Sequence, residues 1–262
     1  MIIKIGGGAT IHVKGILEDV TTLDESVILV HGANAQRDDL ARRLGSPTKN
    51  VTSVSGYESV LTDEGALDML LMAYCGLRNK RIVEMAHQVG LNAMGLSGID
   101  GGLIRGKRNP GIRIEENGKQ KILRDFSGKP SQVNVELLHL LLDHGYTPVL
   151  TVPILDETNT AVNTQNDSII RCLIEALGPS VYLDLFEAPG LLRDRHDEST
   201  LIPRLSPEDL ALEESRVEGR MKRKVQDTRK AFLVGAKKVI YADGRVEHPV
   251  LDALSGHGTV IE

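Results

Sequence analysis

Short apolar runs alternate with longer amphipathic segments along most of this chain. Runs typical of β-strands lie at residues 2–5, 26–30, 91–98, 147–155, 181–186, 237–244 and 258–262. Segments with helical periodicity lie between them, at residues 56–89, 131–144, 167–177, 206–219 and 221–235. A helix between two strands lets the second strand run parallel to the first. The pattern therefore predicts an α/β fold, a three-layer α/β/α sandwich with a mostly parallel central sheet.

One segment departs from this alternation. Residues 103–125 are alternating and basic, and they contain the turn sequences RNPG and ENGK, which predict antiparallel hairpins projecting from the sheet. The length of 262 residues favours one large domain over two independent ones. A break near residues 160–166 divides this single domain into two predicted lobes, about 1–160 and about 161–262.

The composition excludes several classes of function. A net charge of −5, 3% aromatic residues and no Trp argue against nucleic-acid binding. Cys75 and Cys172 are far apart in apolar surroundings, so we expect reduced core residues and neither a disulfide nor a zinc site. The N-terminus lacks the apolar region of a signal peptide. Because no apolar run approaches the ~20 residues of a membrane span, we expect a cytoplasmic protein that does not bind membranes.

Glycines cluster where four predicted strands end, in IKIGGG, LVHGAN, GLSGIDGG and YADG. A glycine there leaves room for a bound anion to approach backbone N–H groups. In parallel α/β folds, ligands bind beyond the carboxyl ends of the strands. The four turns together predict a phosphate-bearing ligand, although the chain has neither a P-loop nor a complete GxGxxG motif.

Three charged residues have positions that allow both a structural and a chemical role. Lys4 interrupts the first apolar strand, either as an edge residue facing solvent or as a cation that reaches a phosphate. Lys224 lies at a predicted helix start, where basic residues oppose the helix dipole, and is otherwise a solvated surface charge. Asp167 opens a predicted helix, a position that suits an N-cap and also an aspartate fixing two lysines around a phosphate.

Longer strings extend this pattern over essentially the whole chain: IIKIGGG, VHGAN, SGYESVLTD, YCGLRNKRIVE, GLSGIDGGL, NTQND, GRMKRKV and YADGRVEHPVLDALSGHGTV. Together they resemble the amino acid kinase family, and within it the acetylglutamate kinase branch. The greatest resemblance is to the kinases that act on an amino-group carrier protein, LysW, for which GRMKRKV with YADGRVE is typical. Ile99 points the same way, because acetylglutamate kinases usually carry a lysine there.

The resemblance implies roles for the residues at matching positions. Lys4 and Lys224 would stabilise the transferring phosphoryl group from the substrate and nucleotide sides, and Asp167 would hold both lysines. The implied substrate-binding residues are Gly7, Gly8, Gly32, Ala33, Asn34, Val60 and Asn163. The implied nucleotide-binding residues are Gly6, Glu187, Gly190, Asp243 and Gly244. ATP would be the donor, with Mg²⁺ held mainly by its phosphates and no dedicated metal site on the protein, and the assembly would be a homodimer.

Three departures from the family pattern bear on the substrate and the nucleotide. The arginine that binds the substrate carboxylate in the family falls on Val60, so a bidentate clamp is missing. HGAN replaces HGGG or HGGS and places the Cβ of Ala33 near the acyl pocket. LFEAPG replaces LSDVPG or LSNVPG, with Phe186 and Glu187 instead of two small polar residues. The candidates to replace the arginine are Arg78, Arg105 and Arg108.

The implied function is ATP-dependent phosphorylation of the side-chain carboxylate of carrier-bound α-aminoadipate or glutamate, which gives an acyl phosphate in lysine or arginine biosynthesis. The alternatives are an N-acetylglutamate kinase and a non-catalytic sensor paralogue, which Val60 and LFEAPG would favour. The basic residues of segment 103–125 suit docking of a small acidic carrier protein, or are ordinary solvated charges. The chain starts at its first strand, without the extra N-terminal helix of arginine-inhibited members, so we expect no inhibition by arginine.

Overall fold

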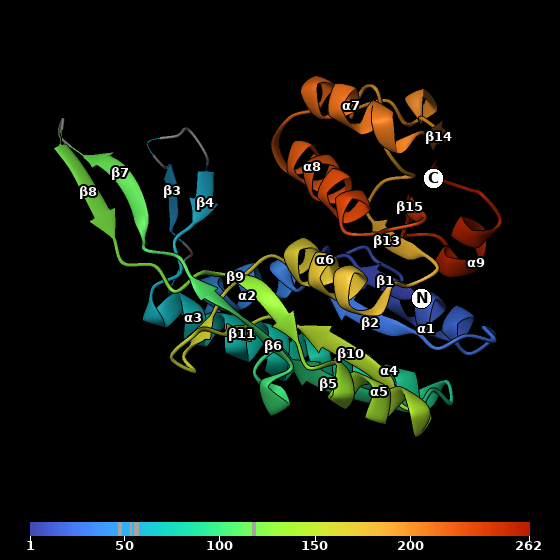
Figure 1. Ribbon diagram of the computed structural model, residues 1–262, viewed down its shortest axis with the longest axis horizontal. Helices are drawn as coiled ribbons and strands as arrows, with labels where there is room; N and C mark the ends of the chain where they lie inside the picture. Colours follow the sequence, from blue (N-terminus) through green and yellow to red (C-terminus); the bar gives the residue numbers. More distant parts are fainter. Residues whose placement is uncertain (47–48, 53, 55–57, 117–118) are drawn as a thin grey trace.

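An eight-stranded sheet forms the centre of the molecule in the computed structural model (Figure 1). The structure describes residues 1–46, 49–52, 54, 58–116 and 119–262, without the side chains at positions 50, 52, 58–60, 116, 119 and 220. In spatial order the strands are β14 (Arg204–Leu205), β16 (Thr259–Ile261), β15 (Val239–Asp243), β13 (Tyr182–Phe186), β1 (Ile2–Ile5), β2 (Ile28–His31), β10 (Thr147–Thr151) and β5 (Ala93–Ser97).

The pairing of these strands confirms the predicted parallel sheet. All neighbours run parallel except β15 and β16, which pair antiparallel. The strands from β14 to β13 all follow residue 161, whereas those from β1 to β5 all precede residue 160. The two halves of the chain therefore meet in the middle of the sheet, between β13 and β1.

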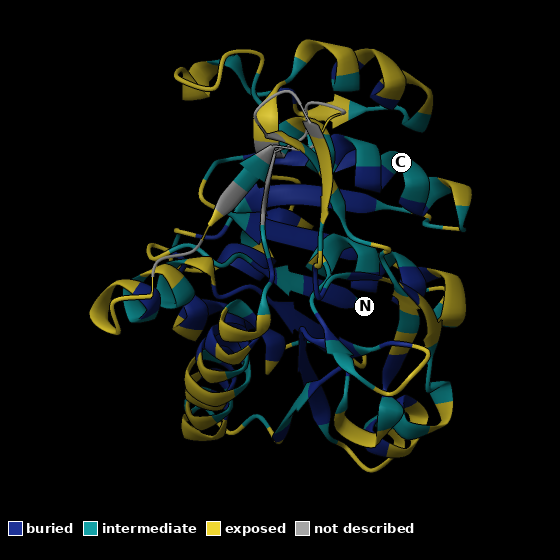
Figure 2. Cartoon of the chain, turned by 90° about the vertical axis from the view of Figure 1, so that its left-hand side faces the viewer, coloured by how far each residue is buried: buried dark blue, intermediate teal, exposed yellow. Residues whose placement is uncertain are grey.

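Helices cover both faces of the sheet, as the alternation of strands and helices predicts. On one face, α1 (Val13–Val20), α4 (Asn79–Gln88) and α9 (Pro249–Leu254) contribute buried side chains to one hydrophobic cluster. The other face carries α5 (Val135–Asp143), α6 (Asn166–Leu177), α7 (Leu210–Arg216) and α8 (Gly219–Leu233). Figure 2 shows the buried strands in the centre and the exposed outer surfaces of the helices.

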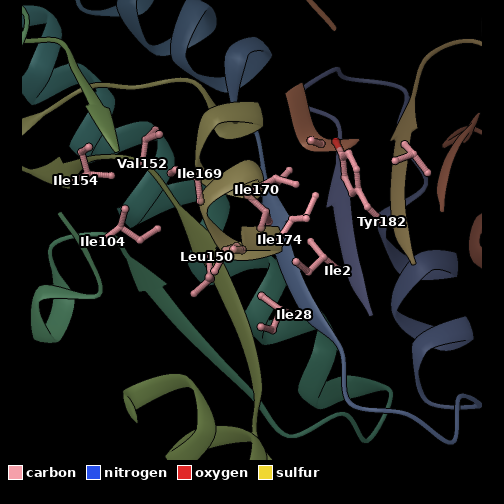
Figure 3. Packing of buried hydrophobic residues seen from close by; sticks show 14 of the residues in the cluster. Ile2, Ile28, Ile104, Leu150, Val152, Ile154, Ile169, Ile170, Ile174 and Tyr182 are labelled. Atoms are coloured by element: carbon pink, nitrogen blue, oxygen red, sulfur yellow. The ribbon is translucent and has the colours of Figure 1, made fainter. Parts of the chain in front are cut away.

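The core under α6 explains why this helix forms where it does. Ile169, Ile170 and Ile174 recur at helical spacing and are buried over Ile2 of β1 and Leu150 of β10 (Figure 3). Burying each of these aliphatic side chains stabilises the fold by about 1.5–3 kcal/mol. The apolar stripe thus fixes α6 across the strands at the middle of the sheet.

Side chains in a strand alternate between the two faces of its sheet, and this places the charged residues of β1 and β13. Ile3 and Ile5 belong to the cluster under α1, α4 and α9. Lys4 therefore shares the opposite face, under α6 and α8, with Ile2. On β13, Tyr182 and Phe186 also lie on that face, and so does Asp184 between them.

A smaller sheet and two hairpins extend from the half of the chain that holds β1, β2, β5 and β10 (Figure 1). The smaller sheet has the order β12 (Ala161–Val162), β11 (Ile154–Leu155), β6 (Ile104–Arg108) and β9 (Gly128–Val133). The hairpins are β3 (Asn50–Thr52) with β4 (Glu58–Val60), and β7 (Ile112–Glu116) with β8 (Lys119–Leu123). The backbone N–H of Val54 donates to the carbonyl of Arg113 at 2.9 Å and joins the two hairpins.

The projecting hairpin predicted within residues 103–125 is confirmed for β7 and β8. The sequence RNPG does not close a second hairpin, because β6 and β7 belong to different sheets. The middle of ENGK, residues 117–118, lies outside the described residues.

Two helix starts differ from the predicted ones. The helix predicted from residue 131 begins at Val135, where the Asn134 side chain caps it by accepting from the N–H of Leu137 at 3.1 Å. The residues before it form β9, which pairs with β6. The helix predicted from residue 56 begins only at Glu64, after β4, and Asp63 is its N-cap. Strand pairing overrode the local helical pattern at both sites, with β6 for β9 and with the neighbouring β3 for β4.

Other segments are shorter or more divided than their periodicity predicts. The apolar run 147–155 is divided between two sheets: β10 lies in the main sheet and β11 in the smaller one, with a cis Val152–Pro153 peptide between them. The segment 206–219 contributes α7 only from Leu210. The remaining elements are α2 (Asn34–Arg43), α3 (Glu64–Leu70), the π-helix η1 (Leu71–Arg78) and the 3₁₀ turns η2 (Asp100–Gly102), η3 (Glu198–Thr200) and η4 (Pro207–Asp209).

Two expectations from composition concern the cysteines and the membrane. Cys172 is buried, Cys75 is half-buried, and both are free thiols. Over the described ranges, no helix has the length and apolar character needed to cross a bilayer.

Candidate active site

Two lysines and two aspartates form a charged cluster beneath α6 and α8, and we call it the lysine–aspartate cluster. The Nζ of Lys4 lies 2.5 Å from Oδ1 of Asp167 and 3.4 Å from Oδ2 of Asp184. The Nζ of Lys224 donates to the same Oδ2 of Asp184. The hydroxyl of Tyr182 also donates to this oxygen, at 3.0 Å. The three residues predicted to act together therefore lie together, with Asp184 between them.

Four different elements bring the cluster together. Lys4 of β1 and Asp184 of β13 are direct partners in the parallel register of the two strands. Asp167 lies in the first turn of α6, and its side chain reaches down to Lys4. The N-cap of that helix is Gln165, so Asp167 is not an N-cap. The ammonium of Lys224, from α8, lies 4.4 Å from the centre of the Phe186 ring, a cation–π contact.

The electrostatics of the cluster act differently on its two lysines. Burial alone lowers the pKa of Lys4, but Asp167 and Asp184 outweigh it and raise this pKa above its ordinary value. Burial lowers the pKa of Lys224, and the attraction of Asp184 offsets only part of that effect. Burial raises the pKa of Asp167, but Lys4 and Lys224 outweigh it and hold this pKa below its usual range.

The arrangement has hydrogen-bonding capacity to spare. An ammonium has three N–H donors, and Lys224 uses one of them on Asp184. Fixed cations with free donors stabilise negative charge that develops on a phosphoryl group, and they need no reorganisation during the reaction. The chemistry this cluster supports is phosphoryl transfer.

Two glycine loops meet next to the cluster. A Cβ on Gly7, after β1, would lie 2.9 Å from the backbone nitrogens of Ala33 and Asn34, after β2. A Cβ on Gly32 would lie 3.0 Å from Cα of Gly7. The loops therefore touch backbone to backbone, and only glycine fits at positions 7 and 32 without a shift.

Helix N-termini add positive potential at the same place. α2 begins at Asn34, directly after the second glycine loop. α6 begins at Asn166, whose side-chain amide donates to the carbonyl of His31 at 2.8 Å. The partial positive charge at both helix ends favours a bound anion. Four of the predicted substrate-binding residues thus lie together where the backbone favours a bound anion: Gly7, Gly32, Ala33 and Asn34.

Gly8, in the first glycine loop, and Glu187 lie next to each other. A side chain on Gly8 would overlap the carboxylate of Glu187. Oε1 of Glu187 accepts hydrogen bonds from the Thr10 hydroxyl at 2.7 Å and from the Thr10 N–H at 3.0 Å. These bonds lower the pKa of Glu187.

The other predicted nucleotide-binding residues divide into two groups. Gly6 donates to the carbonyl of Leu185 at 2.9 Å and Gly244 to that of Phe186 at 2.8 Å, so the loops after β1, β13 and β15 lie side by side. Asp243, at the end of β15, is bound by Arg245, with Nη2 to Oδ2 at 2.6 Å. Gly190 is buried, and a Cβ there would lie 2.6 Å from the Thr259 hydroxyl. Its contact in this structure is packing against β16.

Asn163, a predicted substrate-binding residue, contacts Thr62 and Phe126. Its amide donates to the hydroxyl of Thr62 at 3.1 Å, and its backbone N–H donates to the carbonyl of Phe126 at 2.7 Å. Val60 precedes Thr62 by two residues at the end of β4, and its side chain lies outside the described part of the chain.

The three arginines proposed to replace the missing one have different surroundings. Arg105 is exposed and donates to Asn159 at 2.7 Å. Arg78 is half-buried, burial lowers its pKa, and its Nε and Nη2 have no partner among the described residues. Arg108 stacks 4.1 Å from the centre of the Phe126 ring, and the backbone carbonyl of Phe126 accepts from the N–H of Asn163. Of the three, Arg108 is thus linked to Asn163 through Phe126.

Asp184 and Tyr182 belong to the lysine–aspartate cluster, and the sequence analysis did not single them out. The sequence contained a signal for Asp184: this charged residue interrupts the apolar run VYLDLF as Lys4 interrupts IIKI. Two opposite charges, each central in an apolar strand, indicate an ion pair between neighbouring strands.

Comparisons with known proteins identify the family of this chain. The amino acid kinase family matches residues 1–241, and the chain belongs to that family. Over its full length it is 41% identical to a [LysW]-aminoadipate kinase of Thermus thermophilus, covering 99% of that protein. An acetylglutamate kinase of Methanopyrus kandleri is 32% identical, with 99% of each chain covered. The protein is an ATP-dependent phosphotransferase.

A solved structure supports the fold. The N-acetylglutamate synthase of Neisseria gonorrhoeae superposes with a TM-score of 0.79 at 18% identity, covering 99% of this chain and 58% of the other. This likeness confirms the predicted α/β architecture.

The contact between the glycine loops is testable with one methyl group. In Gly7→Ala the new Cβ forces the backbone of the second loop away, so we expect KM for the phosphoryl acceptor to rise by about 10- to 100-fold. Steady-state kinetics with the acceptor varied measure this. Gly65→Ala is the matched control, because its Cβ would lie 3.7 Å from the nearest atom, and its KM should equal that of the wild type. An unchanged KM for the acceptor in folded Gly7→Ala would contradict the assignment of these two loops to the substrate.

Proposed function

We propose that this protein phosphorylates the side-chain carboxylate of α-aminoadipate or glutamate while the α-amino group is attached to a small acidic carrier protein of the LysW type. The product is an acyl phosphate for lysine or arginine biosynthesis. The observation that carries the proposal is the buried pair of Lys4 and Lys224, held by aspartates, in a chain similar along its full length to a [LysW]-aminoadipate kinase.

The chemistry fits a carboxylate acceptor. A carboxylate is already ionised at about pH 7, so the reaction needs no general base. Its negative charge and that of the phosphates must be brought together, which two fixed cations and backbone N–H groups make possible. Lys4 belongs to the half of the chain, about 1–160, that we assign to the acceptor. Lys224 belongs to the half, about 161–262, that we assign to the nucleotide.

Mg²⁺ enters this proposal with ATP and is held mainly by the phosphates. The support is that Asp167 and Asp184, the carboxylates nearest the site, are already bound by the ammonium groups of Lys4 and Lys224. We also propose a cytoplasmic homodimer. Met72 and Leu77 of η1 are each 45% exposed, and a second copy would cover this apolar surface.

Two alternatives differ in substrate or in class. The similarity to an acetylglutamate kinase favours phosphorylation of free N-acetylglutamate. A sensor without activity would explain Val60 and LFEAPG, but it gives no reason to retain the whole lysine–aspartate cluster, whose burial is costly.

An assay of ATP turnover separates these functions. With carrier-bound aminoadipate or glutamate we expect activity, and with free N-acetylglutamate at least about a hundredfold lower kcat/KM, because the carrier surface contributes to binding. Lys224→Ala should lower kcat by about 10²- to 10³-fold, since it removes a cation that stabilises the transition state. Turnover of N-acetylglutamate alone would establish the first alternative. No turnover with any acceptor would favour the sensor.

We propose further that Arg108 supplies the cation missing at position 60. Its Nε and Nη2 each donate to the carbonyl of Asp125 at 3.3 Å, long hydrogen bonds that a carboxylate would replace favourably. Phe126 holds the plane of the guanidinium and, through its backbone, contacts Asn163.

Arg108→Lys keeps the charge but loses the planar, bidentate group, so it should raise KM for the carrier-bound substrate about tenfold. KM for ATP should stay unchanged. Arg105→Lys is the matched control on the same strand, and its side chain bonds only to Asn159 among the described residues. Steady-state kinetics with each substrate varied in turn measure both constants. Equal effects of the two substitutions would contradict the role of Arg108.

The hairpin of β7 and β8 is the surface we propose for the carrier. It stands away from the main sheet on the same side as the acceptor half (Figure 1), and it presents Arg113 to solvent. Ile122 on the same hairpin is 64% exposed and offers apolar contact to a partner. Basic residues around an acceptor site would steer an acidic carrier.

Reversing one charge tests the docking surface. Arg113→Glu should raise KM for the carrier-bound substrate about three- to tenfold at low salt, because it repels an acidic partner, and the effect should shrink as salt increases. Lys14→Glu in α1 makes the same charge change on a side chain that is 65% exposed and should have little effect. Kinetics at low and high ionic strength provide the measurement, and equal responses of the two variants would refute docking at the hairpin.

A further inference from the structure

One oxygen atom of Asp184 joins the three donors at the base of the lysine–aspartate cluster. Oδ2 accepts from Lys4, Lys224 and Tyr182. The side chain is 1% exposed, and Oδ1 is buried without a hydrogen-bond partner among the described residues. A buried carboxylate is costly unless charges or donors compensate it. The compensation at Asp184 therefore depends on the lysines themselves.

The two aspartates of the cluster have different tasks. Asp167 is 25% exposed, comes from the end of a helix, and contacts Lys4. The hydrogen bond that the structure gives Lys224 goes instead to Asp184. Holding both lysines is the task that the resemblance assigns to Asp167. In this chain the lysine on the nucleotide side depends on Asp184.

We propose that Asp184 is a positioning residue for phosphoryl transfer: it keeps Lys224 charged and at a fixed separation from Lys4. The remaining N–H groups of the two lysines are then free for phosphoryl oxygens. The inference rests on the proposed kinase function, since it explains how the cations of that reaction are held.

The geometry suits positioning because Asp184 has a short side chain on a central strand. Its neighbours in register are Lys4 on β1 and Tyr241 on β15. The ammonium of Lys224 lies between aromatic rings, 4.4 Å from the centre of Phe186 and 5.5 Å from that of Tyr241. The strand fixes the carboxylate of Asp184, and the aromatic rings confine the ammonium of Lys224. The flexible lysine side chain therefore has little freedom.

The charges around Lys224 determine the expected effect of pH. The groups that face it are Lys4 from β1, Asp167 from α6, Asp184 from β13 and Tyr241 from β15. Tyr182, also on β13, donates to the same oxygen of Asp184. Burial already lowers the pKa of Lys224, and Asp184 is the main group that opposes this. Without the charge of Asp184, burial and repulsion by Lys4 lower the pKa further. Because the reaction needs the ammonium form, activity would then be lost at a lower alkaline pH.

Asp184→Asn removes this charge and keeps the shape. We expect the alkaline limb of kcat/KM for ATP to move down by at least about one pH unit. NMR titration of the Lys224 side chain, assigned with Lys224→Arg, should show the same shift without any acceptor present. Asp227→Asn is the matched control: this carboxylate is also buried, and its ion-pair partners Arg171 and Lys230 lie 3.7 Å away. In Asp227→Asn, the alkaline limb of kcat/KM for ATP and the Lys224 titration should both shift much less than in Asp184→Asn.

A double variant covers the case in which Asp184→Asn folds poorly. Asp184→Asn with Lys224→Gln removes one charge of each sign, so the buried cluster stays balanced. If Asp184 acts through Lys224, adding Asp184→Asn to Lys224→Gln should lower kcat less than about threefold. A full additional loss would overturn the proposal, and so would an unchanged Lys224 titration. The NMR titration of Lys224 tests the role of Asp184 even if the protein does not turn over carrier-bound substrates. Failure of the positioning role and failure of the proposed kinase function can therefore be told apart.

Discussion

The burial of two ammonium groups against two carboxylates is the interaction on which the rest of the site depends. Lys4 and Lys224 are far apart in the chain, and each would be expensive to bury alone. Asp184 and Asp167 make that burial possible from two directions, one from the sheet below and one from a helix end above. The sheet register and the placement of α6 and α8 both serve this contact.

The cluster also spans the line where the two halves of the chain meet. β1 and β13 are neighbours in the sheet, yet one begins the half assigned to the acceptor and the other belongs to the half assigned to the nucleotide. An ion pair across this line ties the cations of the two halves to one another. Reactants bound in the two halves would thus meet over a single rigid group of charges, which is what in-line phosphoryl transfer requires.

The proposed acceptor side is where the sequence departs from the family pattern. The lysine–aspartate cluster is built on neighbouring strands of the main sheet, whereas the proposed acceptor side draws on a smaller sheet and projecting hairpins. A substrate carried by a protein needs a surface as well as a pocket. Arg108 stacks on Phe126, whose backbone contacts Asn163, and β7 of the projecting hairpin follows Arg108 in the chain. The valine at position 60 fits the proposal that substrate recognition is spread over these elements.

Alternating strands and helices were enough to predict the parallel sheet, because the two periodicities are local properties of the chain. Motif resemblance singled out Lys4, Asp167 and Lys224, because the strings IIKIGGG, NTQND and GRMKRKV are also readable along the chain. The pairing of Lys4 with Asp184 could not be predicted from the sequence. The register between strands about 180 positions apart depends on which strands become neighbours. For the same reason Val135, and not residue 131, begins α5: β9 had a distant partner in β6. Local sequence determined the elements and the chemical groups, and the tertiary structure decided which charge faces which, because that choice is made by long-range packing.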